Sequence, residues 1–97
     1  MNERQLFTLI LDWRGGTYVS QVWASSPQQA TVLWAQQDFL PPEIELDPRH
    51  RSRLQRDLES GDNRPTRLAD TDNVWCATTV LDDDLACLHV VKTQPSQ

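Results

Sequence analysis

The stretch from Leu6 to Gln37 constrains the fold of this chain more than any other segment. Residues 6–13 alternate in polarity, which is the period-two pattern of a strand with one strongly apolar face. Gly15-Gly16 supplies a two-residue turn, because glycine accepts positive φ at both central positions. The sequence therefore predicts a β-hairpin. The pairs expected across it are Trp13 with Tyr18, Leu11 with Ser20, Leu9 with Val22 and Phe7 with Ala24.

A helix is predicted to follow this hairpin at once. Ser26, Pro27 and Gln29 match a Ser-x-x-Gln capping box with proline at the first helical position. Pro41-Pro42 cannot continue a helix, so we expect the helix to span Ser26 to Leu40. Trp34 lies on its apolar stripe and is interpreted as a core residue rather than a ligand platform.

The middle of the chain is less regular. Residues 43–47 alternate as an edge strand would, but an extended linker fits them equally well. Asp47 and Pro48 are a typical helix start, and Gly61 is a suitable end. Leu54 and Leu58 are the apolar seam of this second helix, which predicts that it lies loosely on the surface.

A second hairpin is predicted from residues 74–81 and 85–93, joined through Asp82, Asp83 and Asp84. Neither of its faces is fully polar, which favours either a central position in the sheet or a pair of strands covered on both sides. The element order is ββα-α-ββ. The sequence thus predicts one α+β domain over residues 1–97, with a mostly antiparallel sheet. The first helix should pack on the inner face, formed by Phe7, Leu9, Leu11, Val22 and Trp75.

Charge is distributed unevenly over a chain whose net charge is −5. Residues 49–67 carry six arginines against three acidic residues, a local charge of +3, and the remainder carries −8. An acidic body disfavours unassisted binding to a phosphate backbone and attracts basic partners. Since the chain shows neither an apolar run of membrane-spanning length nor a secretory leader, we expect it to be soluble and cytoplasmic.

Cys76, Cys87 and His89 are the residues most able to carry site chemistry. Cys87 and His89 share a strand face, which Cys76 could join from across the hairpin. Their spacing is not that of a zinc ribbon or knuckle, and a strand buries a thiol rather than presenting it as a nucleophile. We therefore interpret them as free, buried thiols beside a strand histidine. No catalytic residue, metal or cofactor is expected, and the chain is interpreted as a non-enzyme.

Arginines gather at the start of the second predicted helix. Arg49, Arg53 and Arg56 share one helical face, at spacings i, i+4 and i+7. Such a face could contact nucleic acid, although no helix-turn-helix or RNA-binding aromatic motif accompanies it. A solvated helix face is the interpretation that the acidic body favours.

The outer face of the first hairpin carries more apolar side chains than a monomer needs. The second helix, another protomer or a partner could cover it, and exposed apolar patches commonly mark interaction sites. Ile10, Val19 and Trp23 are the candidate anchors of a protein-binding surface. Asp82, Asp83 and Asp84 are its candidate electrostatic rim. The same three aspartates could instead bind a hard cation or form a solvated hairpin tip.

The segment FTLILDWRGGTYVSQVWASSPQQA resembles the opening of HicB-type antitoxins, where a strand, a glycine turn and a second strand precede a Ser-Pro helix start. More loosely, a small acidic α+β chain is similar to bacterial immunity proteins. Both resemblances imply stoichiometric binding to a protein partner. The alternatives are nucleic-acid binding through Arg49–Arg56 and a role as an accessory subunit of an enzyme complex.

Overall fold

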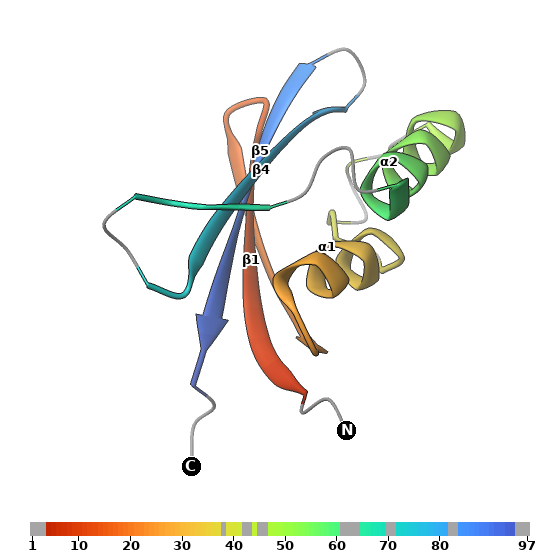
Figure 1. Ribbon diagram of the computed structural model, residues 1–97. Coiled ribbons are helices and arrows are strands. Elements are labelled where there is room, and N and C mark those ends of the chain that lie inside the picture. The colour runs from red at the N-terminus through yellow and green to blue at the C-terminus, as the bar shows by residue number, and fades with distance from the viewer. Residues whose placement is uncertain are drawn as a thin grey trace.

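A computed structural model of the protein describes residues 4–37, 39–41, 44, 47–60, 65–69, 72–81 and 84–94, without the side chains of Ser60 and Leu81. The described residues form five strands and two helices: β1 Gln5–Trp13, β2 Gly16–Ala24, α1 Pro27–Ala35, α2 Pro48–Ser60, β3 Thr66–Arg67, β4 Val74–Leu81 and β5 Asp84–Thr93. The strands make one antiparallel sheet in the order β2-β1-β5-β4-β3. Both helices lie on the same side of it (Figure 1). The predicted α+β class is confirmed.

The two hairpins meet through β1 and β5, which are adjacent and antiparallel at the centre of the sheet. Ile10 lies opposite His89 and Leu11 opposite Leu88. The second hairpin therefore lies inside the sheet, which is one of the two arrangements that its apolar character on both faces favoured. Leu81 pairs with Asp84, so two residues connect β4 to β5 rather than the three predicted. Asp84 belongs to the strand, and residues 82 and 83 lie outside the described residues.

The first hairpin turns at Arg14-Gly15 and not at the predicted Gly15-Gly16. Both central residues have positive φ, 51° and 76°, as the hairpin turn that matches strand twist requires. Trp13 pairs with Gly16 and Leu11 with Tyr18, so the predicted register is wrong by two residues. Because side chains alternate with period two, this shift leaves the inner face unchanged. Arg14 is held by Asp84 (Nε–Oδ2, 2.5 Å) and by the ring of Trp13, 4.7 Å away.

Helix α1 begins as predicted but ends earlier. The Ser26 hydroxyl accepts a hydrogen bond from the Gln29 amide at 3.1 Å, which satisfies a donor of the first turn. The helix ends at Ala35, so the predicted end at Leu40 is wrong. Pro41 disfavours helical backbone angles at Leu40, the residue before it. Phe39 turns back and stacks on Trp34, with ring centroids 4.2 Å apart.

Helix α2 is an integral part of the core, and the expectation of a loosely held helix is wrong. Leu54 and Leu58 are both 1% exposed, in a layer shared with α1 and β4. Gln55 donates to the Ala35 carbonyl at 3.0 Å, and Gln28 donates to the Leu58 carbonyl at 2.8 Å. These hydrogen bonds fix the two helices together. At the N-terminus of α2 the Asp47 carboxylate accepts from the Arg49 amide at 2.9 Å, which confirms the predicted cap.

The core lies between the helices and the inner face of the sheet. Its largest fully buried side chains are Trp34, Phe7, Leu9, Leu11, Leu54, Leu58, Leu88 and Val90. Trp34 is 1% exposed, so its assignment to the core is confirmed. Trp75 packs edge-on against Phe7, 6.2 Å between centroids, which agrees with its predicted place on the inner face. Residues 43, 45 and 46, for which the sequence predicted either an edge strand or an extended linker, lie outside the described residues.

Candidate functional site

Most of the exposed large apolar side chains of the described residues lie on the outer face of the sheet. Both described helices pack on the inner face, so neither covers this one. Among the described residues, five large apolar side chains are exposed, and four of them alternate onto the outer face. These four are Val19 (64%), Trp23 (50%), Val80 (58%) and Leu85 (70%). The apolar surface that the sequence predicted on the first hairpin thus extends to the second.

The anchors predicted from the sequence lie on neighbouring strands. Val19 is opposite Ile10, and Trp23 is opposite Leu6. Ile10 is half-buried, whereas Val19 and Trp23 project from the edge strand β2. A polar belt separates the two apolar pairs, because Gln21 donates to the Thr8 hydroxyl at 3.0 Å. On the first hairpin the outer face therefore holds two apolar contact points rather than one continuous patch.

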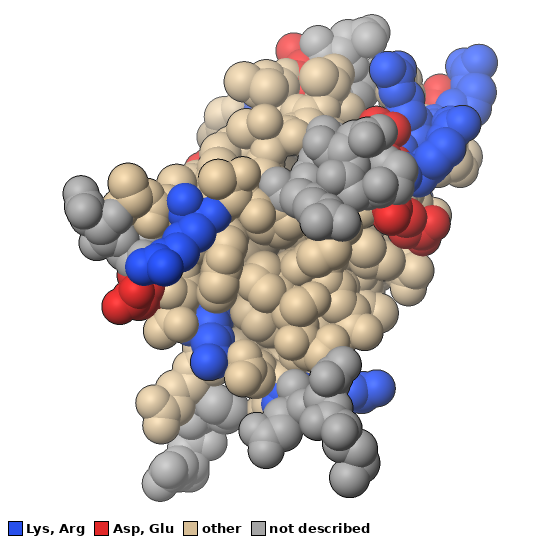
Figure 2. Space-filling model, in the orientation of Figure 1, with Lys and Arg blue, Asp and Glu red and all other residues tan. Residues whose placement is uncertain are grey.

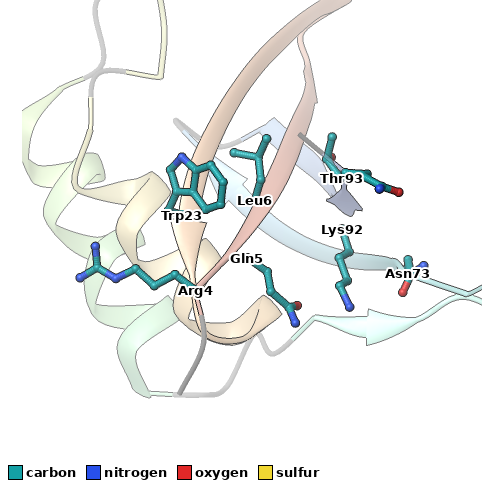
Figure 3. A pocket seen from close by; sticks show the side chains of 8 residues that line it. Arg4, Gln5, Leu6, Trp23, Asn73, Lys92 and Thr93 are labelled. Atoms are coloured by element: carbon teal, nitrogen blue, oxygen red, sulfur yellow. The ribbon is translucent and has the colours of Figure 1, made fainter. Parts of the chain in front are cut away.

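The Trp23 contact point borders a hollow at one end of the sheet, with a volume of about 450 Å³. Figure 3 shows Trp23 and Leu6 side by side, with Arg4 at the margin of the hollow, whereas the Lys92 side chain points the other way, since Lys92 is paired with the inner-face residue Phe7. An indole and a leucine side chain with the cation of Arg4 at the margin suit a partner that brings an apolar side chain next to a carboxylate. Sequence reasoning missed both Arg4 and Lys92: Arg4 precedes β1, whose pairing with β2 places Leu6 opposite Trp23, and Lys92 reaches the hollow only through the pairing of β1 with β5.

Asp84, the one described residue of the predicted electrostatic rim, lies away from Trp23. Asp84 begins β5, whereas Thr93 at the other end of that strand pairs with Leu6, the neighbour of Trp23. At about 3.4 Å per residue, the two ends of β5 are roughly 30 Å apart. Asp84 is ion-paired with Arg14, and Asp82 and Asp83 lie outside the described residues. The structure therefore does not bring this carboxylate and Trp23 into one compact site.

Two thiols and an imidazole meet at the centre of the outer face. Cys76 on β4 is directly opposite His89 on β5, and Cys87 precedes His89 by two residues on the same face. The two sulfur atoms are 3.4 Å apart, and the Cys87 Sγ is 3.7 Å from Nε2 of His89. All three ligand atoms lie within 4.8 Å of one another. Both cysteines are free, as predicted, but half-buried rather than buried.

Asp12 on β1 completes this cluster from the neighbouring strand. Its Oδ2 is 3.9 Å from Nδ1 of His89, and its Oδ1 accepts a hydrogen bond from Thr17 at 2.9 Å. Desolvation, together with the hydrogen bond and charge of Cys76, raises the pKa of the Cys87 thiol to about 11. The Cys87 thiol is thus protonated at neutral pH when no cation is bound beside it. The contact of Asp12 with His89 crosses 77 residues of sequence, so no local pattern announces it.

The arginines of α2 form a separate surface on the helix layer. Arg49, Arg53 and Arg56 are exposed on the side of α2 away from the buried Leu54 and Leu58. Figure 2 shows basic side chains gathering over α2, at the upper right, with acidic side chains beside them. The hydrogen bond from the Arg49 backbone amide, and after it the Arg49 guanidinium 3.4 Å from the carboxylate, hold the pKa of Asp47 below its usual value.

Comparison with known proteins yields no match to a family model, a curated protein or a solved structure. In the described part of the chain, neither helix is both long enough and apolar enough to cross a membrane.

Proposed function

We propose that this protein is a non-enzymatic interaction module that binds a protein partner stoichiometrically through the open face of its sheet. The role is that of an antitoxin or an immunity protein, which masks its partner. The observation that carries the proposal is the half-exposed Trp23, which stands with Val19 on the outer face of an edge strand. Tryptophan is enriched among residues that dominate binding energy.

The surroundings of Trp23 favour a protein partner over a small molecule. The hollow beside it lies at the margin of the sheet and is lined by Leu6, Arg4 and Lys92 among others. Val19 and Ile10 provide a second apolar contact on the same strands, beyond the polar belt of Gln21 and Thr8. Two contact points spread along one sheet face suit the extended surface of a protein. The acidic charge of the chain favours a partner that is basic overall.

Trp23→Ala and Val19→Asp test this surface. The partner to use is the product of the adjacent gene, mixed with the purified chain and followed by sedimentation and isothermal titration. We expect a 1:1 complex with the unaltered chain. Truncating a central anchor costs about 2 kcal/mol or more, so each variant should bind about 30-fold more weakly or worse. Both variants should keep a cooperative unfolding transition, since neither side chain belongs to the core cluster.

Ser52→Asp is the matched control. Ser52 is exposed on α2, so this variant adds the same charge as Val19→Asp on the opposite layer of the molecule. Its affinity for the partner should be unchanged. Equal loss of binding in Ser52→Asp would contradict a site on the sheet face. Unfolding of Trp23→Ala would place Trp23 in the core and remove the proposed anchor.

The exposed arginine face of α2 supports nucleic-acid binding as a second candidate function. If it binds, a gel shift with duplex DNA or RNA should appear at low salt and weaken steeply as salt rises, because phosphate contacts release counterions. Reversing Arg49, Arg53 and Arg56 to glutamate should abolish the shift, whereas Trp23→Ala should leave it unchanged. A chain that gives no shift even at low salt does not use this face for nucleic acid.

A further inference from the structure

We propose that Cys76, Cys87 and His89 bind a zinc ion on the outer face of the sheet, with one coordination position left open. This inference does not depend on the proposed protein-binding function. It departs from the expectation of no metal, which followed from the sequence spacing of the three residues. Strand pairing brings them together, because the register places Cys76 opposite His89.

The distances between the three ligand atoms are close to those expected around one tetrahedral zinc ion. Zinc bonds of about 2.3 Å to sulfur and 2.0 Å to nitrogen place two sulfurs about 3.8 Å apart and a sulfur and a nitrogen about 3.5 Å apart. The corresponding separations are 3.4 Å between the sulfurs and 3.7 Å from Cys87 Sγ to His89 Nε2. The remaining pair, Cys76 Sγ and the imidazole, lies within 4.8 Å. This separation has to shorten by at most about 1.3 Å to match a sulfur and a nitrogen bound to one zinc ion.

Asp12 is placed to orient His89 for this role. Its Oδ2 lies on the Nδ1 side of the ring at 3.9 Å, longer than a hydrogen bond, and an approach of about 1 Å would let it accept the proton of Nδ1 and favour that tautomer. Nε2 is then the lone-pair nitrogen, and it is the atom that lies 3.7 Å from the Cys87 sulfur. A histidine ligand whose other nitrogen faces a carboxylate is the usual arrangement in zinc sites. Asp12 is a positioning residue here, not a ligand.

Two thiolates and one imidazole select a soft or borderline metal, and zinc is the non-redox ion of that class. Binding displaces the two thiol protons to solvent and forms two Zn–S bonds and one Zn–N bond, with no change of oxidation state. The three ligands come from β4 and β5, on the face that the described helices leave uncovered. A water molecule, or a donor atom of a bound molecule, completes the tetrahedron from that side.

Cobalt is the probe for this site. The full-length chain, reduced and freed of metal, is titrated with Co²⁺ and then with Zn²⁺. We expect one Co²⁺ per chain, with the intense visible bands of a tetrahedral ion and a sulfur-to-cobalt charge-transfer band, all displaced by Zn²⁺. Cys76→Ser and Cys87→Ser should each lose the charge-transfer intensity of one thiolate and bind more weakly. Asp12→Asn, which keeps an oxygen acceptor for Thr17, should bind about 10- to 100-fold more weakly.

His50→Ala is the matched control for His89→Ala. His50 is the other histidine of the chain and lies on α2, in the helix layer, so its replacement should leave the cobalt spectrum unchanged. X-ray absorption of the unaltered zinc-loaded chain adds a measurement that needs no variant, with two sulfur ligands expected at about 2.3 Å. Octahedral cobalt bands, a sulfur-free zinc shell, or binding that survives His89→Ala but not His50→Ala would each overturn the proposal.

Discussion

Replacing Trp34 by alanine is expected to destabilise the protein by about 3–5 kcal/mol, the range for deleting a large buried aromatic side chain. Trp34 is 1% exposed and has the largest volume among the fully buried side chains. Its ring stacks on Phe39 at 4.2 Å, so the deletion also removes the contact that folds the chain back after α1. Since domains of this size have free energies of unfolding of about 5–15 kcal/mol, the loss is a large share of the total. Urea unfolding followed by circular dichroism measures it.

Trp23→Ala is the control for Trp34→Ala, because it removes the same side chain from a half-exposed position. Its effect on the free energy of unfolding should stay below about 1 kcal/mol, as for surface substitutions in general. The comparison separates the two tryptophans by layer: Trp34 stabilises the fold, and Trp23 is available for contact with a partner. Similar losses in the two variants would contradict the assignment of the outer face as open.

Leu58→Ala is expected to destabilise the protein by about 2–5 kcal/mol, since a cavity replaces a leucine side chain that is 1% exposed. Leu58 anchors the C-terminal half of α2 against α1, where its carbonyl also accepts the hydrogen bond from Gln28. This result would show that α2 belongs to the cooperative core, contrary to what its single apolar seam predicted. Chemical unfolding monitored by tryptophan fluorescence and by circular dichroism should give coincident transitions.

Arg53→Ala is the companion variant for Leu58→Ala. Arg53 lies on the exposed side of the same helix, and alanine has the higher helix propensity, so the free energy of unfolding should change by less than about 0.5 kcal/mol. A negligible effect of Leu58→Ala, or loss of the α2 signal in a separate early transition, would restore the loosely held helix that the sequence predicted.

Local patterns predicted those parts of the fold that depend on local physics. Alternation placed Phe7, Leu9 and Leu11 on the core face, and this survived a two-residue error in hairpin register because the pattern has period two. The start of α1 followed from the Ser26 cap, a contact between residues three apart. Its end did not, because Phe39 turns back onto Trp34 in a tertiary contact that the helical period cannot encode.

The candidate site was only partly predictable for the same reason. Val19 and Trp23 were recognised as outward-facing from the alternation of β2, and the structure places them there. The sequence did not show which side of the sheet α2 packs on. Leu54 and Leu58 are buried in the core that α1 shares, so α2 lies on the inner side and leaves the outer face uncovered. The proximity of Asp12, Cys76 and His89 required the pairing of β1 with β5 and of β5 with β4.

By itself the sequence determined two hairpins, the helix starts after Ser26 and Asp47, and the inner face of the sheet. Each of these rests on neighbours a few residues apart, where alternation, capping and proline geometry act. The tertiary structure alone decided that β1 joins β5, that both helices lie on one side, and that Asp12 comes within 3.9 Å of His89 on the other. Those outcomes depend on contacts between segments that are far apart in the sequence. The free energy that favours such contacts comes from burying apolar side chains of several segments in one core, and the pattern within a single segment does not specify that core.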